Sequence, residues 1–154
     1  MKLRQLTCML MACALVLGSI ISPVQATDVS DEAVIWLEDL EWEWIDLSEL
    51  EYETGPMPLT TDKIDKSISQ FSIVCVPSFM DFDANDLVTF NCSYSPSSAS
   101  VDFGVISSAG KFYSINGKEG SINQAIRINQ AGKYAVAIRN NSSQTVSVVG
   151  FVNY

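Results

Sequence analysis

The residue types that most often carry out catalysis are scarce in this chain. It contains no histidine, so neither a Ser-His-Asp triad nor a Cys-His pair can form. A glycosidase-like mechanism needs two carboxylates that converge in a cleft. Asp102 and Glu119 are acids of the second half, and no supporting motif surrounds either of them. The sequence therefore predicts a protein that is not an enzyme.

One short loop has the oxygen-rich pattern of a calcium site. Asp81, Asp83, Asn85 and Asp86 place carboxylate and amide oxygens close together in the chain. An EF-hand loop would need glycine at its sixth position and glutamate at its twelfth, where this chain has Asp86 and Cys92. Asp and Asn also stabilise turns by hydrogen bonding to their own backbone. We expect a hairpin loop here, with these four residues as weak metal candidates, and no metal or cofactor.

Cys75 and Cys92 lie in two apolar runs on either side of that loop. Two thiols without histidine make a poor zinc site, because structural zinc takes four ligands, usually Cys or His. In an oxidising compartment a pair of cysteines predicts a disulfide. If the two runs form a hairpin that pairs Cys75 with Cys92, its centre falls between Asp83 and Ala84, where a loop is expected. The sequence favours a disulfide, with two buried thiols as the alternative.

All three tryptophans, Trp36, Trp42 and Trp44, lie in residues 27–60, a segment with many acids and no base. Its apolar positions fit helical spacing from Ala33 to Leu50, while residues 40–44 equally fit strand spacing, so both structures stay open. Crowded carboxylates repel one another, which favours an open chain. We expect a largely disordered acidic arm. It either docks loosely on its own domain or uses its tryptophans to anchor a partner with a basic surface.

The first 26 residues have the order of a secretory signal peptide. Lys2 and Arg4 precede an almost wholly apolar run over residues 6–21, and Val24 and Ala26 stand before the predicted cut. An uncleaved anchor and a lipoprotein signal at Cys13 are the alternatives. We expect residues 1–26 to be removed, which predicts a secreted, extracellular protein without stable membrane insertion.

The net charge of −9 is unevenly distributed. Residues 27–60 carry the excess of acids, whereas acids and bases balance from Thr61 onward. Nucleic acid and anionic lipid are not expected as partners, because their phosphates would be repelled. The run Gly55-Pro56-Met57-Pro58 breaks regular structure and places a domain boundary near residue 60.

Residues 61–154 are patterned as strands. Apolar residues alternate with polar ones in several short runs, and Ser, Asn, Gly and Pro mark the turns between them. Such a pattern places one face of each strand inside and the other in solvent. It predicts an all-β fold, an antiparallel, jelly-roll-like two-sheet β-sandwich of about seven to eight strands. The alternating runs cover residues 69–75, 88–94, 101–105, 111–115, 122–128, 134–138 and 146–148.

The order of strands and turns from Val88 to Tyr154 resembles the bacterial prepeptidase C-terminal domains. Three stretches carry the resemblance: Val88-Thr89-Phe90, residues 99–103 leading to the turn before residues 110–113, and residues 131–136 before a closing strand. It covers somewhat under half of the chain. The resemblance implies a small secreted β-sandwich module of accessory character without a catalytic constellation. It implies a fold and no activity.

These features together predict a secreted β-sandwich with a binding or interaction role outside the cell. The expected partner is an unknown protein or a surface glycan. The alternative functions are a carbohydrate-binding module and, third, an unrecognised enzyme. Sugar-binding sandwiches present exposed aromatic rings, and of the adjacent Phe112 and Tyr113 one must face away from the core.

Overall fold

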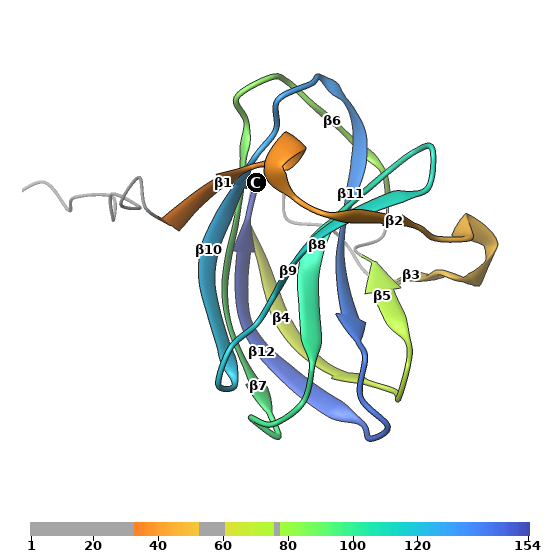
Figure 1. Ribbon diagram of the computed structural model, residues 1–154, viewed down its shortest axis with the longest axis vertical. Helices are drawn as coiled ribbons and strands as arrows, with labels where there is room; N and C mark the ends of the chain where they lie inside the picture. The colour runs from red at the N-terminus through yellow and green to blue at the C-terminus, as the bar shows by residue number, and fades with distance from the viewer. Residues whose placement is uncertain (1–32, 53–60, 76–77) are drawn as a thin grey trace, which may run out of the picture.

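The alternation of apolar and polar residues becomes two packed β-sheets in the computed structural model, which describes residues 33–52, 61–75 and 78–154 (Figure 1). The predicted antiparallel two-sheet sandwich is confirmed, and the described residues contain more strands than predicted. The predicted signal peptide, residues 1–26, lies outside the described residues. Within them, no helix has the length and apolar character needed to cross a bilayer.

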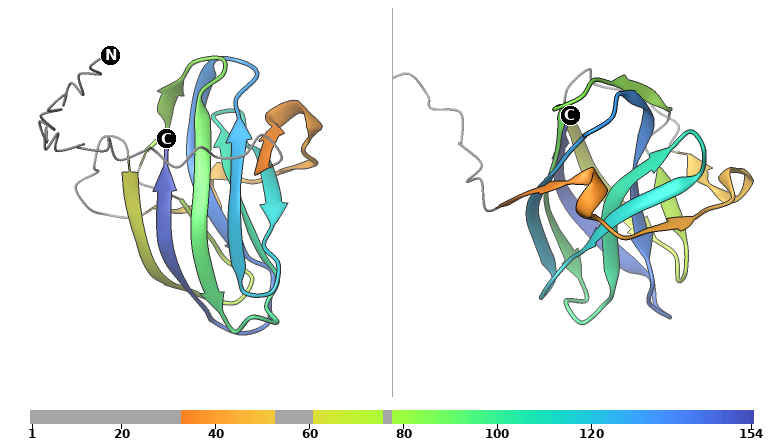
Figure 2. Two further views of the ribbon diagram at one scale, coloured as in Figure 1. Left: turned by 90° about the vertical axis from the view of Figure 1, so that its left-hand side faces the viewer. Right: turned by 45° about the horizontal axis from the view of Figure 1, so that its top comes forward.

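Sheet A has five strands in the order β1-β10-β7-β12-β4. Figure 2 (left) shows β4, β12, β7 and β10 side by side. Every pairing is antiparallel except that of β1 with β10. The strand bounds are β1 (Val34–Trp36), β4 (Thr61–Ile68), β7 (Leu87–Ser95), β10 (Ser121–Arg127) and β12 (Val146–Asn153).

Sheet B has seven strands, in the order β2-β9-β8-β11-β5-β3 with β6 paired to another part of β11. Its long central pair is β8 and β11, which run antiparallel from Tyr134↔Ser107 to Asn140↔Val101. The strand bounds are β2 (Trp42–Trp44), β3 (Glu51–Tyr52), β5 (Ile73–Cys75), β6 (Met80–Phe82), β8 (Val101–Ser107), β9 (Lys111–Asn116) and β11 (Gly132–Asn140).

The interior between the sheets is filled by the inward side chains of both. On β7, Val88, Phe90, Cys92 and Tyr94 are buried and alternate with more exposed residues. Each large apolar side chain buried in this way contributes roughly 1.5–3 kcal/mol. On β8, by contrast, every residue from 101 to 106 is buried. A strand is buried continuously along its length when both faces of its sheet are covered. The outer face of sheet B must therefore also be covered.

The acidic arm provides that cover, and the prediction that it is largely disordered is wrong for residues 33–52. The described part of the arm begins with β1 at the edge of sheet A and crosses to sheet B, where β2 pairs with β9 and β3 pairs with β5 (Figures 1 and 2). Two 3-10 turns, η2 (Leu37–Asp39) and η3 (Leu47–Glu49), connect these strands. Strand spacing was therefore the right alternative at residues 42–44, and no α-helix forms in the described arm.

Buried leucines hold the arm in place. Leu37 joins the sandwich interior, and Leu50 joins a second apolar cluster on the outer face of sheet B with Cys75, Ile106 and Phe112. Burial of these side chains outweighs the mutual repulsion of the carboxylates, because Glu38, Asp39, Glu41 and Glu43 stay at the surface, where water screens their charges. We call this second cluster the outer cluster; its buried members are Leu50, Cys75, Ile106, Phe112 and Ala137.

The predicted disulfide between Cys75 and Cys92 is wrong: both are free, buried thiols. Cys92 lies on β7 and faces the sandwich interior, whereas Cys75 lies on β5 and belongs to the outer cluster. Sheet B therefore separates the two sulfur atoms. The predicted hairpin fails because β6 intervenes between β5 and β7 and pairs with β11. Burial raises the pKa of Cys75 to about 12 and that of Cys92 to about 11.

Candidate functional site

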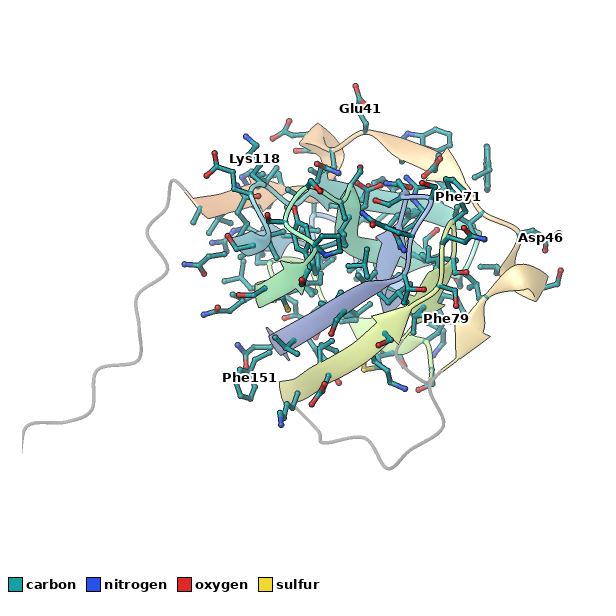
Figure 3. The ribbon with its side chains drawn as sticks, turned by 90° about the horizontal axis from the view of Figure 1, so that it is seen from below. Glu41, Asp46, Phe71, Phe79, Lys118 and Phe151 are labelled. Carbon is teal, nitrogen blue, oxygen red and sulfur yellow. The ribbon has the colours of Figure 1, made fainter. Side chains whose placement is uncertain are left out.

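Two clefts adjoin on the outer face of sheet B, where the arm crosses it. The larger has a volume of about 530 Å³ and lies between arm residues 39–43 and strands β8, β9 and β11. The smaller has a volume of about 340 Å³ and lies between arm residues 44–46 and residues 71–73. Arg139 lines both, so the clefts meet at its side chain. We call the pair the arm clefts. Figure 3 shows Glu41, Phe71 and Asp46 along this side of the molecule, away from Phe151.

Arg139 ties the arm to the sandwich. Its Nε and Nη2 donate to Oδ2 of Asp102 at 3.2 and 2.6 Å, and its Nη1 donates to Oε1 of Glu43. Its guanidinium carbon lies 5.3 Å from the centre of the Phe112 ring. Burial lowers the pKa of Arg139 from its usual value, yet a guanidinium stays charged at neutral pH. One cation thus joins β2, β8 and β11.

Two asparagines complete the hydrogen bonding of Asp102. Asn116 donates through Nδ2 to Oδ1 at 2.8 Å, and Asn141 donates to Oδ2 at 2.8 Å. The Asp102 residue is only 7% exposed, and a buried carboxylate is tolerated when it is paired and hydrogen-bonded. In the described part of the chain, no buried side-chain nitrogen or oxygen lacks a partner. Asp102, Asn116 and Arg139 of this hydrogen-bond network line the larger cleft.

Exposed aromatic side chains stand at the rim of the clefts. Trp42 and Trp44 lie on β2 and are 46% and 63% exposed. Their ring centres are 5.5 Å apart with the planes at 87°, so they form a corner rather than a flat platform. The ammonium of Lys111, across the strand pair on β9, lies 4.2 Å from the Trp42 ring centre and 5.6 Å from that of Trp44. This is a cation–π arrangement.

Phe71 also lines the smaller cleft. It is 70% exposed and has φ of +52°, in the left-handed region. That conformation costs a non-glycine residue roughly 1–2 kcal/mol. The backbone is held there because the Phe71 N–H donates to the Ser142 carbonyl at 3.3 Å and the Ser72 N–H donates to the Ser69 carbonyl at 3.3 Å. The turn thus holds an apolar ring in water.

The structure brings two of the three predicted interaction residues together. Trp42 and Trp44 share the β2 edge of sheet B, while Trp36 lies on β1 in sheet A, where its ring centre is 5.3 Å from the guanidinium of Arg127. Phe112 is the member of the Phe112-Tyr113 pair that faces away from the interior, and the arm buries it completely.

The four metal candidates are placed by turn and strand structure. Asp81 lies on β6 and forms an ion pair with Lys133 at 2.9 Å, so the predicted hairpin loop is wrong at this position. The Asp86 carboxylate accepts from the Asp83 N–H at 2.7 Å, and Asn85 adopts a left-handed φ of +79°. Within the described ranges, no three His, Cys, Asp or Glu side chains are grouped to hold a metal ion.

Sequence reasoning missed Phe71 and Arg139, and it treated Asp102 as an isolated acid. The alternation over residues 69–75 predicts a strand that includes Phe71, and no local sequence signal marks Phe71 as an exposed turn residue. Arg139 is one of several bases that balance the charge of the second half. Its cleft position depends on the pairing of β11 with β8, which links residues far apart in the chain.

No protein-family model matches this sequence, and neither a curated protein nor a solved structure matches it. The resemblance to prepeptidase C-terminal domains therefore stays a prediction.

Proposed function

We propose that this chain is a secreted, non-catalytic binding protein that acts outside the cell through its arm clefts. One observation carries the proposal: Trp42, Trp44 and Phe71 are exposed around one pair of adjoining clefts. Large aromatic side chains gain more free energy from burial than almost any others, and they dominate the energetics of binding interfaces.

The way these side chains are held adds to the proposal. The β2 strand is fixed by Glu43 to Arg139, and Phe71 is fixed by its backbone hydrogen bond to Ser142. A surface held in its binding conformation loses less entropy when a partner binds. Backbone strain at an exposed residue is also more common at binding sites than elsewhere.

The chemistry around the clefts supports a non-catalytic role. The chain has no histidine to act as a general base. The thiols of Cys75 and Cys92 are buried, and their raised pKa values keep them protonated at neutral pH. The Asp102 carboxylate is occupied by Arg139 and two asparagines. Asp102 and Arg139, which line the clefts, are thus engaged in holding the structure together.

Carbohydrate binding is the second candidate function. Exposed tryptophans are the usual platforms for the apolar faces of sugars, and the larger cleft also offers the polar side chains of Ser114 and Asn116. An unrecognised hydrolase is the third candidate function. Turnover assays on chromogenic ester, peptide and glycoside substrates test it, and no turnover would speak against it.

The binding proposal is tested with matched variants on two arrays, one of peptides and one of glycans. Trp44→Ala and Phe71→Ala remove aromatic rings at the clefts. Trp36→Ala and Phe151→Ala remove the same residue types from exposed positions on sheet A. We expect array signals that the first two variants reduce and the last two leave intact. An equal effect of all four, or no signal on either array, contradicts the proposal.

Secretion is supported by the order of charged, apolar and small residues over positions 1–26. N-terminal sequencing of the protein exported by a bacterial host tests it. We expect the chain to start at Thr27. A protein that retains Met1 and stays with the cells contradicts secretion without affecting the binding proposal.

A further inference from the structure

The charge around the arm clefts is one-sided. Residues 33–52 contain seven acidic residues and no basic one. Asp39, Glu41 and Glu43 line the larger cleft and Asp46 lines the smaller, whereas Arg139 is the one base among the residues that line either. Both oxygens of the Arg139 partner, Asp102, are already taken by hydrogen bonds. The larger cleft therefore keeps an excess of negative charge that Arg139 does not neutralise. In the smaller cleft Asp46 shares the lining with Arg139, whose charge is already paired with Asp102 and Glu43.

The molecule already binds its own cations in this region, in two ways. The Lys111 ammonium lies against the Trp42 and Trp44 rings. The Arg139 guanidinium lies between two carboxylates and over the Phe112 ring. Carboxylates beside aromatic rings are a good environment for a basic side chain, because the charge is paired and the aliphatic stem packs on the ring.

The smaller cleft has the features that a further basic side chain needs. Trp44 and Phe71 form apolar walls and are the two most exposed aromatic residues of the described chain, while Asp46 supplies a carboxylate. Ser48 donates to Asp46 through its backbone N–H at 2.9 Å and its hydroxyl at 2.7 Å, which lowers the pKa of Asp46 and keeps it ionised. The cleft volume of about 340 Å³ lies at the lower end of the range of ligand sites.

A sugar fits the surface around Trp42 and Trp44 less well than a basic side chain does. A pyranose stacks on the open face of an aromatic ring. Trp42 and Trp44 stand perpendicular to each other, and the Lys111 ammonium lies against the Trp42 ring. A neutral sugar would also leave the excess negative charge of the larger cleft uncompensated.

We infer that the arm clefts bind a lysine- or arginine-bearing segment of a protein partner, with the basic side chain between Trp44 and Phe71. This inference rests on the proposed function and names the class of its ligand. The acids of the arm attract the segment over a distance of about 8 Å at physiological salt. The aromatic walls and Asp46 then hold the basic side chain.

The test uses three short peptides of one sequence and isothermal titration calorimetry. The first peptide carries two arginines and two leucines, the second has citrulline in place of arginine, and the third has glutamate. Citrulline keeps the planar shape and size of the side chain but removes its charge, because a carbonyl oxygen replaces one of the guanidinium nitrogens. We expect the arginine peptide to bind at least about tenfold more tightly than the citrulline peptide, and this difference to shrink in 0.5 M salt.

The matched variants locate the binding. Trp44→Ala and Phe71→Ala should each lower the affinity for the arginine peptide by about tenfold. Trp36→Ala and Phe151→Ala should change that affinity by less than about twofold. Circular dichroism of each variant checks the fold, which removal of an exposed side chain should leave intact. Equal binding of the arginine and citrulline peptides, or an equal response of all four variants, overturns the inference.

Glycan binding separates this inference from the proposed function. If glycans bind in a way that depends on Trp44 and the arginine peptide does not bind, the proposed function stands and the inference fails. If neither peptide nor glycan binds, both fail.

Discussion

The sandwich interior and the outer cluster are both apolar, but they are built in different ways. The interior draws its side chains from the long strands of two sheets, with pairs such as Phe90 and Phe103 in ring contact. The outer cluster is small and is covered by the short strands and 3-10 turns of the arm. The arm holds its position through Leu50 and through the ion pair of Glu43 with Arg139. The interior therefore maintains the fold, while the arm shapes the surface of sheet B.

The largest effect is expected in the interior. Phe103 is fully buried and contacts the Phe90 and Tyr94 rings. Phe103→Ala leaves a cavity among them and should lower the free energy of unfolding by about 4 kcal/mol. Guanidinium denaturation followed by circular dichroism measures this. Phe151→Ala, at an exposed position, is the control and should change the free energy of unfolding by under about 0.5 kcal/mol. Equal losses would mean that the interior is not the main source of stability.

The next effect concerns the link between the two regions. Arg139→Ala leaves the Asp102 carboxylate buried without its cation and frees Glu43 of the arm. We expect a loss of about 3 kcal/mol in the free energy of unfolding, since removing the cation of a partly buried ion pair leaves the charge of the buried Asp102 uncompensated. The control, Lys133→Ala, breaks an exposed ion pair with Asp81 and should cost less than about 1 kcal/mol. Similar losses for both variants would show that Arg139 contributes no more to stability than an exposed ion pair does, and would contradict its role in joining the arm to the sandwich.

A smaller effect should appear when the arm alone is loosened. Leu50→Ala removes a buried side chain from the outer cluster and should cost about 2 kcal/mol. Because Cys75 belongs to that cluster and Cys92 to the interior, a thiol reagent should label Cys75 faster in this variant. The rate at Cys92 should stay the same. Parallel acceleration at both thiols would indicate global unfolding and would end the distinction between the two regions.

The last prediction uses alkaline pH. An ordinary thiol titrates at pKa 9.0, whereas burial raises the pKa of Cys75 to about 12. Between these values the unfolded chain loses a proton that the folded chain keeps, so the free energy of unfolding falls as pH rises. Cys75 should contribute a slope of up to about 1.4 kcal/mol per pH unit in this window and none below it. Chemical denaturation from pH 8 to 11 should show that Cys75→Ala has the shallower slope.

Short-range patterns were enough for much of the fold. The alternation in residues 88–94 predicted the buried face of β7 correctly, because a strand with one face in a core must alternate. The same rule could not place Cys75, since a sheet covered on both faces buries both sets of residues. Nor could it predict that a segment so rich in carboxylates would fold, because the apolar surface that holds it is assembled from β5, β8, β9 and β11.

Several features follow from the sequence alone: the all-β class, the absence of histidine chemistry, and the concentration of acids and tryptophans before residue 60. These are properties of composition and local period. Three features follow only from the tertiary structure: the thiols lie on opposite faces of sheet B, Arg139 pairs with Glu43 and Asp102, and Phe71 and Trp44 line the same cleft. Each of these depends on pairing between distant segments, and local sequence preferences carry no information about which distant surfaces become neighbours.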